Sequence, residues 1–379
     1  MKIFIPKETF PNELRVAMIP ADVEKLIKKG ADIEIETGLG AACNFTDQQY
    51  EKAGAKISRD RVTGFSSAEI VLRLRKPAQE EVRLLKKGCI HVSYLDPFYE
   101  SKLVQMLAEQ GVSSICMEMI PRTTLAQKMD ALSSQASLGG YVAVILAAER
   151  LNKIFPMMMT PAGTIQPARV FIIGAGVAGL QAIATAKRLG ARVDAFDTRP
   201  VVAEQVKSLG AKFVEVDLGE TGQTKDGYAR ELTSEQLLKQ REAMAKVCAQ
   251  ADVVITTAQV FGRKAPKIVT REMVAGMKPG SLIVDMAVES GGNVEGSESG
   301  QEVVVNGVRI IGLENLPGHV SVNASQMYSA NLTSLVEHFW NKETKKFDLH
   351  LDDEIIKGCL ITHNNEIHSA ILKKHYEGK

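Results

Sequence analysis

The sequence lacks several features that would set it apart from ordinary globular proteins. Its five cysteines are scattered and include no Cys-x-x-Cys pair, so we expect neither a disulfide framework nor a zinc site. No apolar run approaches the roughly 20 residues of a membrane helix, and the N-terminal MKIFIPKE has no apolar signal-peptide core. The formal net charge of +1 gives no reason to expect nucleic acid. We therefore expect a cytoplasmic protein that binds neither a metal nor nucleic acid.

The most informative stretch runs from Val170 to Pro200, VFIIGAGVAGLQAIATAKRLGARVDAFDTRP. Its first four residues predict a buried strand, and Gly174, Gly176 and Gly179 follow in the pattern G-x-G-x-x-G. The first glycine allows a tight turn, the second lets a pyrophosphate approach the backbone, and the third lets the next helix pack on the sheet. The N-terminus of that helix offers N–H groups and a partial positive charge to an anion. The stretch predicts a dinucleotide-binding unit.

Asp197 follows the next predicted strand, Arg192 to Phe196. A carboxylate there accepts hydrogen bonds from the adenosine ribose and repels a 2′-phosphate, which favours NAD(H) over NADP(H). Arg199 lies just beyond it, where an arginine can hold a 2′-phosphate. With Asp197 in front of it, we interpret Arg199 as stacking on adenine or pairing with a phosphate. The alternative is a glycine-rich turn in an unrelated α/β domain, but the strand, helix and acidic residue together favour the dinucleotide site.

The whole chain alternates predicted strands and helices, so we expect an α/β protein with two Rossmann-like domains and mainly parallel sheets. The second is a doubly wound NAD-binding domain. A polar stretch from Arg122 leads to a helix predicted from Leu138, and a polar insert at 217–234 is long enough to be functional or disordered. The tail from Phe347 is predicted to form short strands and turns that return to the first domain. The expected domains are 1–132 plus 325–379, and 133–324.

Several stretches resemble the alanine dehydrogenase and pyridine nucleotide transhydrogenase superfamily over the whole chain. They are IPKE…NELRVAMIP, RTTLAQKMDALSSQA, MTPAGTIQPARVFIIGAGVAGLQAIATAKRLGARVDAFDTRP, TTAQVFGRKAPKIVT and LIVDMAVESGGN. Within it, the chain is most similar to the NAD(H)-binding component, domain I, of the proton-translocating NAD(P) transhydrogenases, in its separately encoded alpha-subunit form. The deciding match is R-x4-Q-x2-D-x2-S, present as Arg122, Gln127, Asp130 and Ser133.

The resemblance implies that this motif contacts the nicotinamide. Gln127 can donate to the carboxamide carbonyl, Asp130 can accept from its amide, and Ser133 can support the loop. It also implies a mobile loop with Gly227 and Tyr228 at its tip. The strand end from Thr256 to Gln259 lies where ligands bind in such sheets. The expected catalytic set is Arg122, Gln127, Asp130 and Ser133, and the expected cofactor contacts are Arg122, Gln127, Asp130, Gly174, Ala175, Gly176, Val177, Gly179, Asp197, Thr198, Arg199, Gly227, Tyr228, Gln240, Thr257, Ala258 and Gln259.

The function implied by the resemblance is hydride transfer between NADH on this chain and NADP⁺ on a partner domain. Membrane-spanning partner subunits would couple it to proton movement, and the chain would be a homodimer at the cytoplasmic face of the inner membrane. Asn331, on a predicted long helix, is expected to serve packing.

Two alternatives remain open. The chain resembles alanine dehydrogenase at Arg15 and Lys76, but that enzyme also needs a general acid/base beside its substrate. Where that enzyme has its histidine after Tyr-Leu, this chain has Asp96, and His91 is out of register. The other alternative is a catalytically silent NAD(H)-binding regulatory protein.

Overall fold

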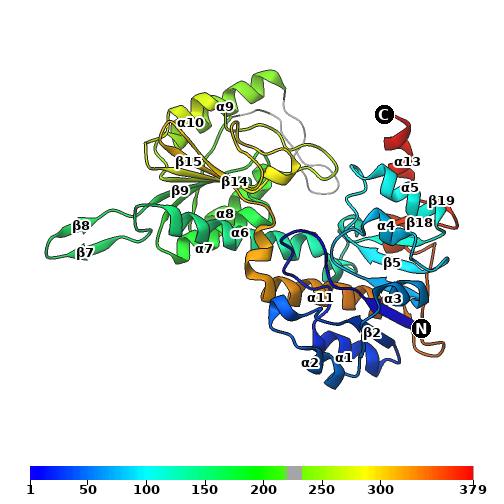
Figure 1. The fold of residues 1–379 in the computed structure, drawn as a ribbon. Helices are drawn as coiled ribbons and strands as arrows, with labels where there is room; N and C mark the ends of the chain where they lie inside the picture. Colours follow the sequence, from blue (N-terminus) through cyan, green and yellow to red (C-terminus); the bar gives the residue numbers. More distant parts are fainter. Residues whose placement is uncertain (218, 220–232, 379) are drawn as a thin grey trace. The chain divides into compact units, whose positions relative to one another are not determined.

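The computed structural model describes residues 1–217, 219 and 233–378. Contacts within the chain divide it into two compact units, Met1–Gln135 with Gly318–Lys379, and Ala136–Pro317. Each unit contains a mainly parallel sheet flanked by helices (Figure 1), which confirms the predicted fold class. The boundaries fall inside the helix α6, Ala131–Arg150, and the short 3₁₀ segment η6, Leu316–Val320. That the units are the independent domains expected above stays a prediction.

The sheet of the first unit has the strand order β19-β18-β6-β5-β4-β1-β2-β3. Strands β1 to β6 are parallel, whereas β18 from the tail pairs antiparallel with β6, and β19 pairs antiparallel with β18. The central strands β4 and β5 are wholly buried, as strands of a parallel sheet covered on both faces usually are. The strands are β1 Lys2–Ile5, β2 Asp32–Glu36, β3 Lys56–Ser58, β4 Ile70–Leu72, β5 Ile90–Ser93, β6 Ser113–Cys116, β18 Leu360–His363 and β19 Glu366–Ile367, with a separate pair β16 Trp340–Asn341 and β17 Lys346–Phe347.

The helices of the first unit cover both faces of this sheet, and two apolar clusters fill the space between. The long helix α11, which precedes the tail, packs against α1 and against the 3₁₀ turn η3, Gln127–Met129. The tail contributes Phe347, Ile355 and Leu360 to the apolar core of this unit. The helices are α1 Pro20–Lys28, α2 Asp47–Lys52, α3 Arg61–Ser67, α4 Gln79–Val82, α5 Ser101–Glu109, α11 Ser321–His338, α12 Glu354–Cys359 and α13 Ala370–Glu377.

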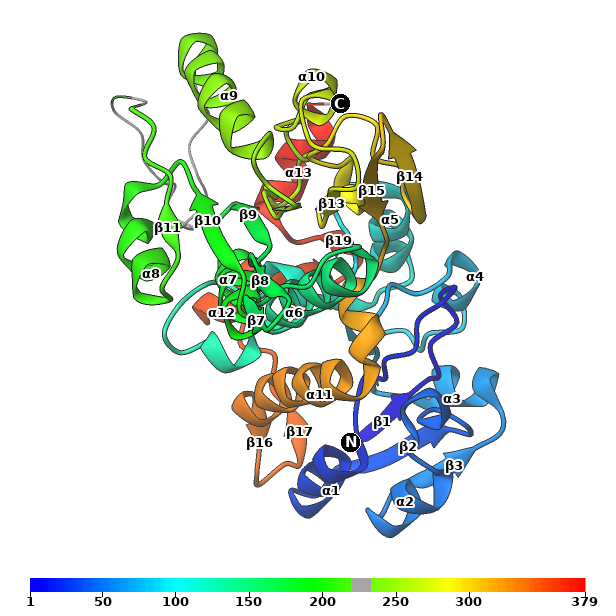
Figure 2. The same ribbon diagram turned by 90° about the vertical axis from the view of Figure 1, so that its left-hand side faces the viewer.

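The sheet of the second unit has the order β11-β10-β9-β12-β13-β15-β14, with all pairs parallel except β14 with β15. The order reverses between β9 and β12, and such a switch point forms a binding crevice at the carboxyl ends of the strands. Helices α9 and α10 cover one face, and α7 covers the other (Figure 2). The elements are β9 Arg169–Ile173, β10 Arg192–Phe196, β11 Lys212–Phe213, β12 Val253–Thr256, β13 Leu282–Asp285, β14 Gln301–Val305, β15 Val308–Gly312, α7 Val177–Arg188, α8 Ala203–Ser208, α9 Ser234–Cys248 and α10 Arg271–Ala275.

Two further elements depart from compact α/β layers. The helix α6, Ala131–Arg150, has the length and mean hydropathy of a membrane span, but core helices of globular proteins can share both properties. Of its most apolar 18-residue window, 44% is buried. A hairpin of β7, Met158–Thr160, and β8, Gly163–Ile165, extends away from the seven-stranded sheet of the second unit (Figure 1). All six of its strand residues are exposed.

Several predicted element boundaries were wrong. Helix α6 begins at Ala131 rather than Leu138, because Asp130 caps a turn that the serine-rich sequence does not indicate. The tail forms helices α12 and α13 besides its strands. The sequence reading also omitted β3, α3, α4 and β14, each short or placed at a sheet edge.

Candidate functional site

The glycine turn leaves β9 and enters α7 with the geometry that a dinucleotide needs. Gly174 has a φ of +97°, which a residue with a side chain rarely adopts. A Cβ on Gly179 would stand 1.9 Å from the Gly174 carbonyl oxygen, so only glycine lets the helix start so close to the turn. A Cβ on Gly176 would meet only the Arg199 guanidinium, at 4.0 Å. The backbone of Gly176 is therefore open to a ligand, beside the helix N-terminus that attracts an anion.

Asp197 follows β10 and is bound on both carboxylate oxygens. The Ala175 N–H donates to Oδ2 at 2.8 Å, and the Arg199 N–H donates to Oδ1 at 2.9 Å. The Arg199 guanidinium adds bonds from Nε to Oδ1 at 2.9 Å and from Nη2 to Oδ2 at 2.8 Å. These bonds raise the pKa of Arg199. In this structure Arg199 therefore pairs with the carboxylate; the adenine or phosphate partner expected from the sequence is untested.

A hollow of about 180 Å³ opens beside Asp197. Its walls come from the ends of β10 and β11, where an adenosine would lie in a doubly wound fold. Their apolar side chains suit a flat base. The lining residues are Phe196, Asp197, Thr198, Pro200, Phe213, Val214, Glu215, Val216, Asp217 and Gly219.

The loop after β12 carries Thr257, Ala258 and Gln259, and it is held by residues that the sequence reading did not select. The Asn293 side chain accepts from the Ala258 N–H at 3.0 Å and donates to the Ala258 carbonyl at 2.8 Å. Asp285 in turn accepts from the backbone of Asn293. Thr257 donates to the Gly174 carbonyl at 3.1 Å, which ties this loop to the glycine turn. Asp285 and Asn293 both lie in the LIVDMAVESGGN stretch that carries the resemblance, but no local pattern in it indicates a contact with Ala258.

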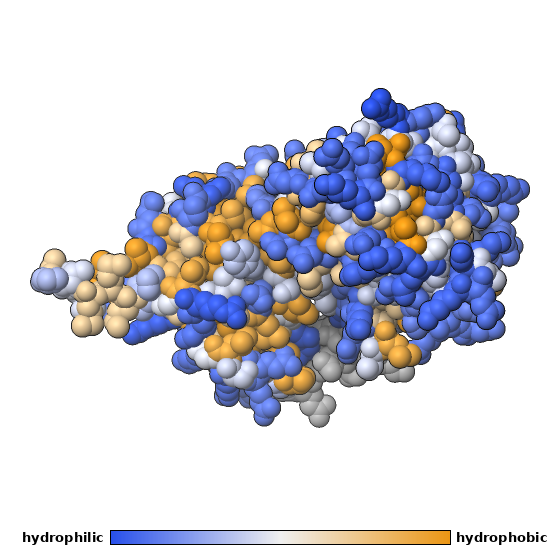
Figure 3. All heavy atoms as spheres, turned by 90° about the horizontal axis from the view of Figure 1, so that it is seen from below, coloured by the Kyte–Doolittle hydropathy of each residue, from blue (hydrophilic) through white to orange (hydrophobic). Residues whose placement is uncertain are grey.

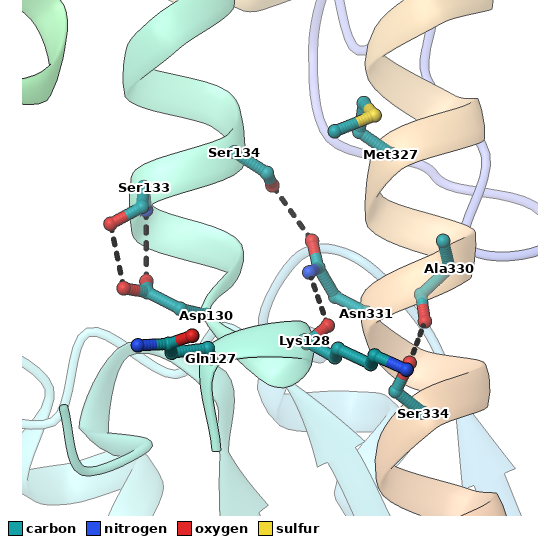
Figure 4. A pocket seen from close by; sticks show the side chains of 9 residues that line it. All are labelled: Gln127, Lys128, Asp130, Ser133, Ser134, Met327, Ala330, Asn331 and Ser334. Carbon is teal, nitrogen blue, oxygen red and sulfur yellow. Dashed lines mark hydrogen bonds between the residues drawn. The ribbon is translucent and has the colours of Figure 1, made fainter. Parts of the chain in front are cut away.

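The R-x4-Q-x2-D-x2-S motif lies in the first unit, at a pocket of about 470 Å³ between η3, the start of α6 and the helix α11 (Figure 4). The Gln127 and Asp130 side chains lie on the same side of the loop in Figure 4, and Gln127 is exposed at the rim. Arg122 is also exposed, but it does not line this pocket. The lining residues are Gln127, Lys128, Asp130, Ser133, Ser134, Met327, Ala330, Asn331 and Ser334.

Asp130 caps the first turn of α6. Its Oδ1 accepts from the Ser133 N–H at 2.9 Å, and its Oδ2 accepts from the Ser133 hydroxyl at 2.6 Å. An aspartate before a helix satisfies N–H groups that have no partner within the helix. Ser133 is therefore a helical residue that fixes the carboxylate, rather than part of a loop. Each Asp130 oxygen keeps capacity to accept a further hydrogen bond.

Asn331 does more than fill space on α11. Its amide donates to the Lys128 carbonyl at 2.8 Å, and its oxygen accepts from the Ser134 hydroxyl at 2.7 Å. Both bonds are drawn in Figure 4. These two bonds hold both sides of the turn that carries Gln127 and Asp130. Asn331 therefore positions this turn, in addition to the packing role expected from the sequence.

Two arginines near this motif share a buried carboxylate. Glu13 binds Arg15 at 2.6 Å and Arg75 at 2.7 Å, and Arg15 also donates to Gln135 at 2.8 Å. Burial alone would raise the pKa of Glu13, but the hydrogen bonds and charges of Arg15, with the charge of Arg75, lower it from 4.5 to about 2. Lys76 pairs with Glu100 rather than with Glu13.

Asp96 and His91, the two residues considered for a dehydrogenase base, lie in different surroundings. Asp96 is exposed and lies 3.5 Å from the Lys76 ammonium. His91 is fully buried on β5, and burial lowers its pKa to about 3. Neither of its ring nitrogens has a hydrogen-bond partner in the portion of the chain that the structure describes. His91 is therefore neutral at physiological pH.

The structure brings the remaining predicted residues together in two groups. Gly174 to Gly179, Asp197 to Arg199 and Thr257 to Gln259 lie at the carboxyl edge of the second unit's sheet. Gln127, Asp130 and Ser133 lie in the first unit. Gln240 is buried on α9, with its carbonyl oxygen unpaired among the described residues. Gly227 and Tyr228 lie outside the described residues.

All five cysteines are free and buried. Burial raises the pKa of Cys89, Cys248 and Cys359 to about 12. Within the described ranges, no group of three His, Cys, Asp or Glu side chains is placed to hold a metal ion.

Family models match nearly the whole chain. The model described as alanine dehydrogenase/PNT, N-terminal domain, matches residues 4–139, and the C-terminal domain model matches residues 143–370. The chain belongs to the alanine dehydrogenase/PNT family. Family membership agrees with the resemblance stated from the motifs.

Relatives within the alanine dehydrogenase/PNT family are similar over full length. A Rhodospirillum rubrum protein, named as the first part of NAD(P) transhydrogenase subunit alpha, is 44% identical over 98% of this chain and 99% of its own. A solved transhydrogenase from Sinorhizobium meliloti is 41% identical, with a TM-score of 0.86 over 98% of this chain and 100% of the other. A solved L-alanine dehydrogenase has a TM-score of 0.81 over 100% and 99% at 24% identity, a likeness that shows the shared fold alone.

Proposed function

We propose that this chain is the NAD(H)-binding component of a proton-translocating transhydrogenase. It would pass hydride between NADH held here and NADP⁺ held on a partner domain. The observation that carries the proposal is the combination of a dinucleotide turn ending in Asp197 with the Gln127 and Asp130 pair at the capped start of α6. The full-length similarity to chains named as the first part of the NAD(P) transhydrogenase alpha subunit supports it.

Hydride transfer between two nicotinamides leaves no amine or hydroxyl to deprotonate, so the site needs positioning groups more than an acid or base. The bound dinucleotide supplies the hydride chemistry. The N-terminus of α7 and Gly176 would hold its pyrophosphate, and Asp197 its ribose. Gln127 would donate to the carboxamide carbonyl, while Asp130, fixed by Ser133, would accept from the carboxamide N–H. Arg122 would reach the carboxamide, a ribose oxygen or a phosphate oxygen.

The remaining parts of the reaction would belong to partners. This sequence contains one G-x-G-x-x-G turn, so a second domain would bind NADP(H). Membrane-spanning subunits would carry the proton, with this chain docked on them at the cytoplasmic face of the inner membrane. We propose these partners from the transhydrogenase relatives.

We also propose that the chain is a homodimer. The second unit exposes apolar side chains on the β7–β8 hairpin and on α6, and apolar residues gather on this surface in Figure 3. Met159 is 74% exposed and Met157 is 56% exposed. Exposed apolar patches of this kind mark protein interfaces. The residues are Tyr141, Ile145, Ile154, Met157, Met158, Met159 and Ile165.

The proposed function is tested by mixing this chain with a recombinant NADP(H)-binding transhydrogenase domain. Hydride transfer from NADH to a spectrally distinct NADP⁺ analogue is expected. The Gln127→Asn variant should slow single-turnover transfer by at least about tenfold, because it shortens a positioning arm, and leave NADH affinity within about threefold. Gln105→Asn makes the same change on the exposed face of α5 and should transfer at the wild-type rate.

The same preparation separates the alternatives. Steady NADH production from NAD⁺ and L-alanine would replace the proposal with an amino-acid dehydrogenase. Tight NADH binding without transfer to the partner's NADP⁺ analogue would favour a regulatory NAD(H)-binding protein.

A further inference from the structure

The ion pair of Asp197 and Arg199 occupies the place where cofactor specificity is decided. The Asp197 side chain is 7% exposed and the Arg199 side chain is 16% exposed. The guanidinium binds the carboxylate through two hydrogen bonds, with Nε donating to Oδ1 and Nη2 donating to Oδ2. Such a bidentate pair is stronger and more directional than a single contact between a cation and an anion.

The hydrogen bonds of Asp197 leave no room for a ribose while this pair is closed. An ionised carboxylate has about four lone-pair sites. Two accept from the backbone N–H groups of Ala175 and Arg199, and these belong to the turn itself. The other two accept from the guanidinium. A pair of ribose hydroxyls can therefore bind Asp197 only by replacing the guanidinium.

The guanidinium also stands where it could meet a phosphate. Its Nη2 is 4.0 Å from the Cβ position of Gly176, so it lies over the glycine turn. The neighbouring residues Asp197, Thr198 and Pro200 line the hollow assigned to adenosine. An arginine at this place in a Rossmann fold is the group that accommodates the 2′-phosphate of NADP(H). The chain thus carries the cation that NADP(H) would require, held by a carboxylate.

We propose that the Asp197–Arg199 pair, rather than Asp197 alone, selects NAD(H) against NADP(H). Asp197 repels the 2′-phosphate and also binds the guanidinium that would otherwise attract it. Removing the Asp197 charge therefore does two things: it ends the repulsion and releases Arg199 to the 2′-phosphate. This inference rests on the proposed NAD(H) site and adds Arg199 as its second specificity determinant.

The test compares the full chain with Asp197→Asn, Arg199→Met and the double variant, using NADH and NADPH fluorescence titrations. Asparagine keeps an oxygen for the Ala175 N–H, so the turn should persist, and circular dichroism with thermal unfolding checks this. Asp197→Asn should weaken NADH binding and tighten NADPH binding by about tenfold or more, the worth of one charged hydrogen bond. The double variant should lose the NADPH gain. Arg199→Met should bind NADPH no tighter than wild type, because Asp197 still repels the 2′-phosphate, and should bind NADH tighter than wild type, because no guanidinium competes for Asp197.

Three results would each contradict one part of the proposal. A folded Asp197→Asn chain that binds NADPH no tighter than wild type refutes the masked-cation role, as does a gain that survives in the double variant. Loss of NADH binding in folded Arg199→Met would make the guanidinium a ligand of NADH rather than a competitor. If the wild-type chain binds neither dinucleotide, the proposed function itself fails.

Discussion

The ionised form of Glu13 stabilises the folded chain. Its pKa is lowered from 4.5 to about 2 in the folded chain, so folding favours its ionised form. The corresponding stabilisation is present above pH about 4.5 and is lost as the pH falls towards 2. One pKa unit corresponds to about 1.4 kcal/mol, so roughly 3 kcal/mol depends on this group. Urea unfolding of wild type at a series of pH values should show this loss.

The Glu13→Gln variant should lack that component of the acid dependence. It should also be less stable at pH 7 by about 3–5 kcal/mol, because Arg15 and Arg75 lose their shared carboxylate. Glu80→Gln makes the same change at an exposed position and should leave both curves unchanged. An identical acid dependence in wild type and Glu13→Gln would contradict the assignment.

Asp130 combines a helix cap with the proposed carboxamide acceptor, and two substitutions separate these roles. Asparagine is as good an N-cap as aspartate, so Asp130→Asn should change stability by less than about 0.5 kcal/mol. Alanine removes the bonds to Ser133 and should cost about 1 kcal/mol. Both should slow hydride transfer by about fivefold or more, because both lose an acceptor oxygen. If Asp130→Asn transfers hydride at the wild-type rate, Asp130 is only a cap.

At the scale of elements, the second unit depends on a close contact between α6 and α7. A Cβ on Gly140 would stand 2.2 Å from the Ala178 carbonyl oxygen, which is backbone and cannot turn aside. A Cβ on the neighbouring Gly139 would approach the flexible end of Met286 at 3.2 Å. Gly140→Ala should therefore destabilise the chain by about 1–3 kcal/mol through overpacking. Gly139→Ala should be neutral or slightly stabilising, since alanine favours helix by up to about 1 kcal/mol.

The urea midpoints of the two glycine variants check this pair directly. Equal midpoints would mean that α6 and α7 separate enough to accept a methyl group, contrary to the contact seen.

The strands of the second unit could be predicted well from the sequence. The sequence predicts Arg192–Phe196, Val253–Thr256 and Leu282–Asp285 with the bounds that the structure has. The last two are short apolar runs ended by a polar residue, and the first lies between Gly190 and Asp197. The start of α6 could not be predicted this way. Its first turn is polar, and its side chains bind Asp130, Asn331 and Arg15, two of which are distant in sequence.

The same limit applies to the candidate site. The glycines and Asp197 could be predicted as cofactor contacts because their spacing within one short stretch matches the dinucleotide-binding pattern. Asn293 and Asn331 were not given their roles, because each acts on backbone far along the chain, at Ala258 and Lys128. No local pattern records such a bond.

For the whole molecule, the proposed homodimer is the feature that a solution experiment can reach most directly. The hairpin residue Met159 is 74% exposed, and the adjoining Met158 and Ile165 are also exposed. Covering them with a second copy would bury apolar surface, and each Å² buried would stabilise the dimer by about 25 cal/mol. Light scattering and sedimentation across a range of concentrations should show a dimer in the wild type.

Met159→Asp should weaken that dimer by at least about tenfold, because a charge would have to be buried against an apolar surface. Val304→Asp offers a matched control, since Val304 is 66% exposed on β14 and lies on another element of the same unit. It should dimerise as wild type does. A wild-type monomer would refute the homodimer. A dimer equally stable in Met159→Asp would remove the hairpin from the interface, because a buried unpaired carboxylate could not be accommodated there without loss of affinity.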